Sequence, residues 1–204
     1  MPLLIVAELV VHRRMLPVAR QFLERGLIAD ASRARFDAAV ASAMRLRNSV
    51  LAELLLIAFV YLVGIFYVWP QYIALDVATW YAAPVEGGRV LSMAGWWFAY
   101  VSLPLFQFIL LRWYFRLFVW VRFLWQVSRC ALRLLPAHPD RTAGLGFLST
   151  TVVALAPVLA AHGVMVAGTL ANQIFYQGAT LGDFKVELVV VVAFLLLIVV
   201  GPLL

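Results

Sequence analysis

Four apolar stretches, each about as long as a membrane is thick, dominate this 204-residue chain. They cover residues 50–69, 96–113, 146–171 and 186–204, and none contains more than one formally charged residue. About 20 apolar residues in an α-helix cross a bilayer core of roughly 30 Å, with every backbone N–H bonded inside the segment. The pattern predicts an all-α integral membrane protein with four transmembrane helices.

The composition excludes an ordinary soluble domain. Hydrophobic residues make up 65% of the chain and charged residues 13%, whereas apolar usage in soluble proteins is nearer half. The single cysteine, Cys130, rules out an intramolecular disulfide and a metal site built from cysteines. No cofactor and no metal site is indicated.

The arginines are distributed unevenly along the chain and predict its orientation. Eight lie between His12 and Asn48 and six between Arg112 and Arg141, whereas the two intervening loops hold only Arg89 and Lys185 as basic residues. By the positive-inside rule, both basic segments should be cytoplasmic, and four spans place the C-terminus there too. Because these arginines flank apolar spans, the net charge of +6 indicates contact with anionic headgroups rather than nucleic acid.

Residues 1–48 are expected to form a basic, cytoplasmic or interfacial helical segment, and residues 49–204 the transmembrane bundle. Gly26 is typical of a helix end and Asp30 of an N-cap. The first eleven residues are too few to span. They are either the end of an additional span from a longer parent chain or a short buried or interfacial helix.

A basic amphipathic helix is predicted over about residues 114–135, after the second span. Pro104 is expected to kink that span. At 100° per residue, five arginines fall on one side of the helix, where we expect contacts with lipid headgroups. They are Arg112, Arg116, Arg122, Arg129 and Arg133.

The third span carries small residues on one face, which predicts close helix packing. These are Ala156, Ala160, Gly163 and Ala167. The segments 70–92 and 172–182 are expected to be loops.

Two polar residues inside the spans are candidates for a functional role. Glu53 lies one turn into the first span, where it is expected to pair with an arginine such as Arg45, Arg47 or Arg112, with ion or proton transport as the alternative. His162 is expected to be a hydrogen-bonded packing residue. A proton or ion role, or haem ligation across an oligomer, is the alternative for it.

The turn between the amphipathic helix and the third span contains His138, Pro139, Asp140 and Arg141. Pro139 cannot continue a helix. Asp140 is therefore expected to cap the third span, so that Asp140→Asn should be nearly silent. Arg141 should reach a phosphate headgroup. His138 is a further candidate functional residue of this turn.

Two stretches together resemble a group of bacterial multi-pass membrane proteins of unassigned function. They are Arg45-Leu46-Arg47-Asn48-Ser49 followed by Ala52-Glu53-Leu54-Leu55-Leu56, and His138-Pro139-Asp140-Arg141-x-x-Gly144-Leu145-Gly146-Phe147-Leu148. Ala143 stands where such chains carry glycine. The resemblance implies a bacterial inner membrane and a longer parent chain, and it implies no activity.

The favoured function is a non-catalytic subunit or accessory module that packs through its spans against itself or within a larger membrane complex. An oligomeric channel or transporter using Glu53 and His162 is the alternative. A membrane-embedded enzyme acting on a lipid at the His138–Asp140 turn is a third hypothesis.

Overall fold

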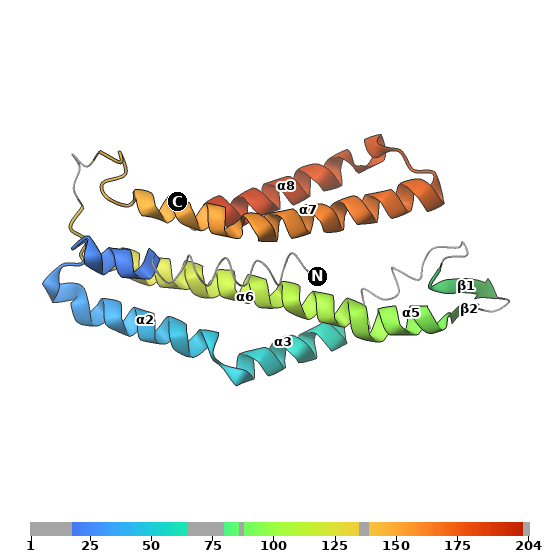
Figure 1. Ribbon diagram of the computed structural model, residues 1–204, viewed down its shortest axis with the longest axis horizontal. Helices are drawn as coiled ribbons and strands as arrows, with labels where there is room; N and C mark the ends of the chain where they lie inside the picture. Colours follow the sequence, from blue (N-terminus) through green and yellow to red (C-terminus); the bar gives the residue numbers. More distant parts are fainter. Residues whose placement is uncertain (1–17, 65–79, 86–87, 135–138, 202–204) are drawn as a thin grey trace. The chain divides into compact units, whose positions relative to one another are not determined.

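In the computed structural model the chain is predominantly helical (Figure 1), and the structure describes residues 18–64, 80–85, 88–134 and 139–201. One antiparallel hairpin, β1 (Ala82–Val85) with β2 (Gly88–Leu91), lies inside the segment expected to be a loop. The helical class is confirmed. The labelled α-helices are α2 (Arg33–Arg47), α3 (Val50–Val63), α5 (Met93–Trp97), α6 (Leu103–Ser128), α7 (Ser149–Gln177) and α8 (Lys185–Val200).

Within the described ranges, two helical stretches are long and apolar enough to cross a membrane, Met93–Ser128 and Gly146–Phe175. A third span is obtained if the bent pair Asp30–Arg47 and Val50–Val63 counts as one. Four spans are not confirmed, because the 14 residues of α3 and the 16 of α8 rise only about 21 and 24 Å, less than a bilayer core of roughly 30 Å. Residues 65–69 and 202–204 of the predicted spans lie outside the described residues.

The chain divides into two compact units, Met1–Arg45 with Leu117–Leu204, and Leu46–Arg116. We call the first the terminal unit and the second the central unit. Helix α6 begins in the central unit and ends in the terminal unit. Within the terminal unit, the first basic segment packs with the second one.

In the central unit, serine side chains begin both apolar helices. The Ser49 hydroxyl accepts the N–H of Ala52 at the start of α3, and the Ser92 hydroxyl accepts the N–H of Gly95 at the start of α5. Before Pro104 the helix widens into a π-helical turn, Phe98–Ser102, in which the N–H of Leu103 bonds to the carbonyl of Phe98. This π-helical turn ends two residues before Pro104, where the sequence predicts a kink.

Helix α6 corrects the predicted helix boundaries. The span and the amphipathic helix are one continuous helix from Leu103 to Ser128, so the second helix expected over 114–135 does not begin at a break and ends earlier. Within Met93–Ser128, 36 residues rise about 54 Å, so a helix of this length exceeds one bilayer core.

The terminal unit has an aromatic core. Phe22, at the centre, lies with its ring centroid 5.0 Å from that of Phe147, 6.1 Å from that of Phe36 and 6.4 Å from that of Phe123. The rings come from the first basic segment, from α6 and from the turn before α7. Aromatic pairs at such distances are favourable beyond their buried area. The two basic segments are therefore joined by a common hydrophobic core.

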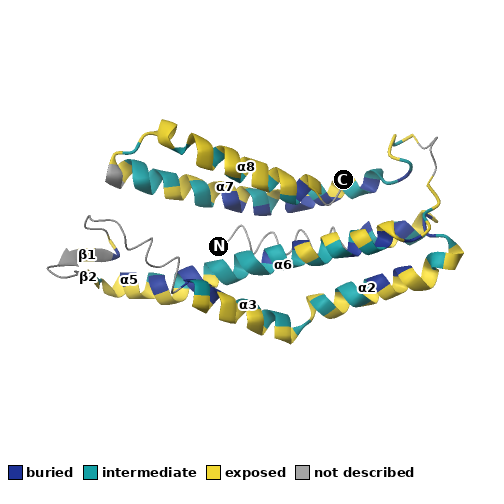
Figure 2. Cartoon of the chain, turned by 180° about the vertical axis from the view of Figure 1, so that it is seen from behind, coloured by how far each residue is buried: buried dark blue, intermediate teal, exposed yellow. Residues whose placement is uncertain are grey.

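Helix α7 begins after the 3-10 turn η4 (Gly146–Leu148), as predicted for a third span starting near Gly146, and it extends to Gln177. Gly178, with φ +67°, ends it in the left-handed conformation that glycine adopts readily. Helix α8 then runs beside α7 (Figure 1), after the 3-10 turn η5 (Leu181–Phe184). Most of α8 is exposed (Figure 2), as is typical of a helix that faces lipid or a partner.

Candidate functional site

Extended backbone joins the two basic segments just after α6 ends. The N–H of Ala29 bonds to the carbonyl of Ala131 at 3.1 Å, and the N–H of Arg133 bonds to the carbonyl of Leu27 at 2.7 Å. Ile28 and Leu132 form the β-bridge between these bonds. This pairing explains why the helix does not continue to residue 135.

Asp30 has a different role from the predicted N-cap. It is the first residue of the 3-10 turn η1 (Asp30–Ser32), whose N-cap is Ala29, and its carboxylate accepts a hydrogen bond from the Arg133 guanidinium at 2.8 Å. The Ser32 hydroxyl accepts the N–H of Ala131 across the same contact. These bonds reinforce the extended pairing between the segments.

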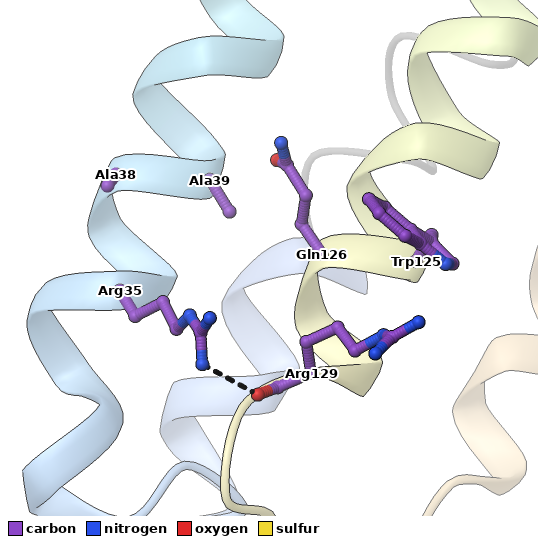
Figure 3. A pocket seen from close by; sticks show the side chains of 6 residues that line it. All are labelled: Arg35, Ala38, Ala39, Trp125, Gln126 and Arg129. Atoms are coloured by element: carbon purple, nitrogen blue, oxygen red, sulfur yellow. Dashed lines mark hydrogen bonds between the residues drawn. The ribbon is translucent and has the colours of Figure 1, made fainter.

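An open groove of about 470 Å³ lies between α2 and the end of α6 (Figure 3). The Arg35 guanidinium donates to the backbone carbonyl of Arg129 at 3.1 Å, which orients the Arg35 side chain along the groove. The Arg129 guanidinium lies 5.2 Å from the ring of Trp125. The lining residues are Arg35, Ala38, Ala39, Trp125, Gln126 and Arg129.

Sequence reasoning singled out Arg129 but missed Arg35. Helical spacing places arginines on faces of α2 and of α6 separately. Nothing in the spacing indicates that α2 and α6 lie next to each other. The sequence therefore indicated a high arginine content in both segments but could not predict a groove between them.

The five arginines predicted to contact headgroups fall into different environments. Arg112 belongs to the central unit and pairs with Glu53, and Arg116 lies 5.3 Å from the ring of Trp113. Arg122, Arg129 and Arg133 belong to the terminal unit, where Arg133 is bound to Asp30. Their contact with lipid headgroups stays a prediction.

The ion pair expected for Glu53 is present. An oxygen of Glu53 lies 3.3 Å from a guanidinium nitrogen of Arg112, so α3 and α6 are linked one turn into α3. The same helices approach closely at Gly64, where a Cβ would lie 2.7 Å from Oε1 of Gln107. Glycine at this position leaves room for the Gln107 side chain.

Asp140 organises the turn before α7. One carboxylate oxygen accepts the N–H groups of Thr142 and Gly144 at 3.0 and 3.1 Å, and the other accepts that of Gly146 at 2.9 Å. Arg141 and Ala143 adopt positive φ angles of 55° and 54° within this turn. His138 lies outside the described residues.

These contacts determine the protonation of Asp140. Burial of the carboxyl raises its pKa, but the N–H donors of Gly146, Thr142 and Gly144 and the Thr142 hydroxyl lower it more. The net effect holds the pKa of Asp140 well below its usual range. A carboxyl that is ionised throughout the neutral range is suited to holding the turn.

Arg25 attaches the same turn to the first basic segment. Its guanidinium lies 5.1 Å from the ring of Phe147 and donates to the carbonyl of Gly144 at 3.4 Å. A guanidinium over an aromatic ring is attracted by the negative face of the ring. The turn thus belongs to the folded terminal unit.

His162 is buried on α7, with 5% of its surface exposed. Its Nδ1 lies 2.8 Å from the carbonyl oxygen of Val158, one turn earlier. Because a carbonyl only accepts, this contact requires a proton on Nδ1. The geometry agrees with a hydrogen-bonded packing histidine.

The small residues predicted for helix packing point out of the chain. Ala156, Ala160, Gly163 and Ala167 are exposed, and a Cβ at Gly163 would meet no atom within 4 Å. The buried positions of α7 lie on another face and include Ala154, Leu155, Val158 and Ala161. Among the described residues of the terminal unit, packing therefore does not use the small-residue face.

Among the described residues, no group of three or more histidine, cysteine, aspartate or glutamate side chains is placed to hold a metal ion. No protein-family model, curated protein or solved structure matches this chain.

Proposed function

We propose that this chain is a non-catalytic membrane module, a subunit or accessory protein that associates through its spans with a second copy or with a larger complex. The observation that carries the proposal is the outward-facing small-residue face of α7. Small side chains gain little from contact with lipid, but they let the backbones of two helices approach closely. Since this face is exposed among the described residues of its unit, a helix of another chain is the partner it suits.

The proposed location is a bacterial inner membrane, with both basic segments and the C-terminus in the cytoplasm. The hydrogen bonds between residues 27–29 and 131–133 support placing the two basic segments on one side of the membrane. The high arginine content of both segments supports the cytoplasmic side.

This topology requires an even number of crossings between the two basic segments. Helix Met93–Ser128 supplies one crossing, and α3 is the apolar helix that follows the first segment directly. In the proposed four-span arrangement, α3 begins the first span, α5 and α6 form the second, and α7 and α8 supply the last two.

Cysteine cross-linking in native membranes tests the association. In a Cys130→Ser background, Ala160→Cys and Ala161→Cys introduce the same thiol at nearly the same depth, on an exposed and a buried position respectively. We expect oxidation to cross-link the Ala160→Cys chain to a second chain and to leave the Ala161→Cys chain monomeric.

A mass measurement on the particle purified in mild detergent complements the cross-linking. A particle heavier than one chain with its detergent is expected. A single chain in the particle, together with no cross-link from Ala160→Cys, would contradict the proposal.

A further inference from the structure

The groove between α2 and α6 exists because α2 carries small side chains at this level. Ala38 and Ala39 form one wall, and Trp125 and Gln126 form the other (Figure 3). Trp125 remains 59% exposed, so a large part of its ring is accessible. The lining is mainly apolar, with the guanidinium of Arg35 near one end.

The charge around this groove is strongly positive. Among the ion pairs within the described ranges, Asp30 is bound to Arg133 and Asp37 to Arg33, which leaves both carboxylates engaged outside the groove. The sequence contains no aspartate or glutamate from residue 113 to residue 139. Arg122 precedes Gln126 by four residues and so lies on the same side of α6.

The hydrogen bond to Arg129 orients the Arg35 side chain and uses only part of its donor capacity. A guanidinium has five N–H donors, and the bond to the Arg129 carbonyl uses one nitrogen, Nη1. The planar arrangement of these donors matches the oxygens of a phosphate group. The same side chain is exposed, so an anion reaches it from solvent or from a membrane surface.

We propose that this groove binds the phosphate group of an anionic phospholipid, with Arg35 as the principal donor. The lipid backbone and the beginning of its acyl chains lie against Ala38 and Trp125, an aromatic residue of the kind found at membrane interfaces. The apolar lining favours a lipid over a free phosphate ester. The inference rests on the proposed membrane location and adds to it a defined ligand and a defined site.

The test uses the full chain purified in an uncharged detergent. Phosphatidic acid and phosphatidylglycerol are titrated and detected by native mass spectrometry, with phosphatidylcholine as the zwitterionic control. Glycerol 3-phosphate and inorganic phosphate form a second arm, which separates a lipid ligand from a free phosphate. We expect binding of both anionic lipids and weaker binding of phosphatidylcholine and of the two soluble phosphates.

Three variants test whether lipid binding depends on the groove itself or only on the positive charge of the chain. Arg35→Gln should weaken binding by about tenfold or more, because it removes a charged donor. Ala38→Leu keeps every charge but fills the groove, and should weaken binding as well. Arg47→Gln, with the same loss of charge at the other end of α2, should leave binding unchanged.

The inference is overturned if Arg47→Gln weakens binding as much as Arg35→Gln, or if Ala38→Leu binds like the unmodified chain. It is also overturned if glycerol 3-phosphate binds as tightly as phosphatidic acid. Membrane fractionation of each variant distinguishes the proposed membrane location from the proposed lipid site. Variants that lose lipid binding but stay in the membrane fraction support the lipid site. An unmodified chain found outside the membrane fraction contradicts the membrane location.

Discussion

The carboxylate of Asp140 accepts the backbone N–H of Gly146 at 2.9 Å across a separation of six residues. Its other oxygen accepts two further N–H groups, from Thr142 and Gly144. Asp140 therefore holds the whole turn and the first residue of η4, which is a larger role than capping one helix end.

This geometry revises the expectation that Asp140→Asn is silent. Asparagine has one carbonyl oxygen, and its amide group would oppose an N–H donor where the second carboxylate oxygen now accepts. We expect thermal stability in detergent to fall in the order unmodified chain, Asp140→Asn, Asp140→Ala. Equal stability of the unmodified and Asp140→Asn chains would show that the second oxygen is dispensable.

The same contact predicts a dependence of stability on pH. Because the pKa of Asp140 is lowered by folding, its contribution is fully present above the ordinary aspartate pKa of about 3.9 and is lost as the pH falls below that value. The stability difference between the unmodified and Asp140→Asn chains should therefore shrink in acid. Thermal unfolding of both chains from neutral to acidic pH measures it.

Phe22 is the centre of the aromatic core that joins the two basic segments. Phe22→Ala should cost about 3–5 kcal/mol, because it leaves a cavity among Phe36, Phe123 and Phe147. Phe175→Ala is the matched control, since that side chain is 82% exposed. Denaturation in detergent compares the two, and similar costs would show that the core is not where the structure places it.

Gly95 lies directly against the carbonyl of Tyr81, which a Cβ would overlap. Because a backbone carbonyl cannot move aside as a side chain does, Gly95→Ala should destabilise the chain by about 1–3 kcal/mol. Gly168→Ala is the control, because a Cβ there meets no atom within 4 Å and alanine favours the helix. Thermal unfolding should show opposite signs for the two substitutions.

The pair of Glu53 and Arg112 is expected to behave as a structural unit. Glu53→Gln and Arg112→Gln should each lower stability, and the double variant should lose less than the sum of the two, because neither charge is left alone. A double-mutant cycle by thermal unfolding measures this coupling. Strict additivity would contradict the structural role and favour an ion-handling role for Glu53.

Labelling of a single cysteine tests the proposed cytoplasmic placement of the basic segments. Cys130 is buried in the core of the terminal unit, so it should react slowly with any reagent. Ser128→Cys, in a Cys130→Ser background, places the thiol on an exposed neighbour. A membrane-impermeant maleimide should label it in inverted vesicles and not in intact cells, and labelling from outside would reverse the topology.

The sequence alone predicted the helical class. It also predicted the start of α3 at Val50 and of the helical stretch Gly146–Phe175 at Gly146. These features are local, because a long apolar run, a serine cap or a glycine turn acts through neighbouring residues. The ion pair between Glu53 and Arg112 was likewise anticipated, since a carboxylate beside an apolar span requires a nearby cation.

The tertiary structure decided which segments meet. The pairing of residues 27–29 with 131–133 ended α6 before residue 135, and the contact of α2 with α6 created the groove at Arg35. It also decided that α7 buries Ala154, Leu155, Val158 and Ala161, while the small-residue face stays exposed among the described residues. Lipid tails and a protein interior are equally apolar, so hydrophobic periodicity cannot distinguish a face that packs inside the chain from one that faces outward.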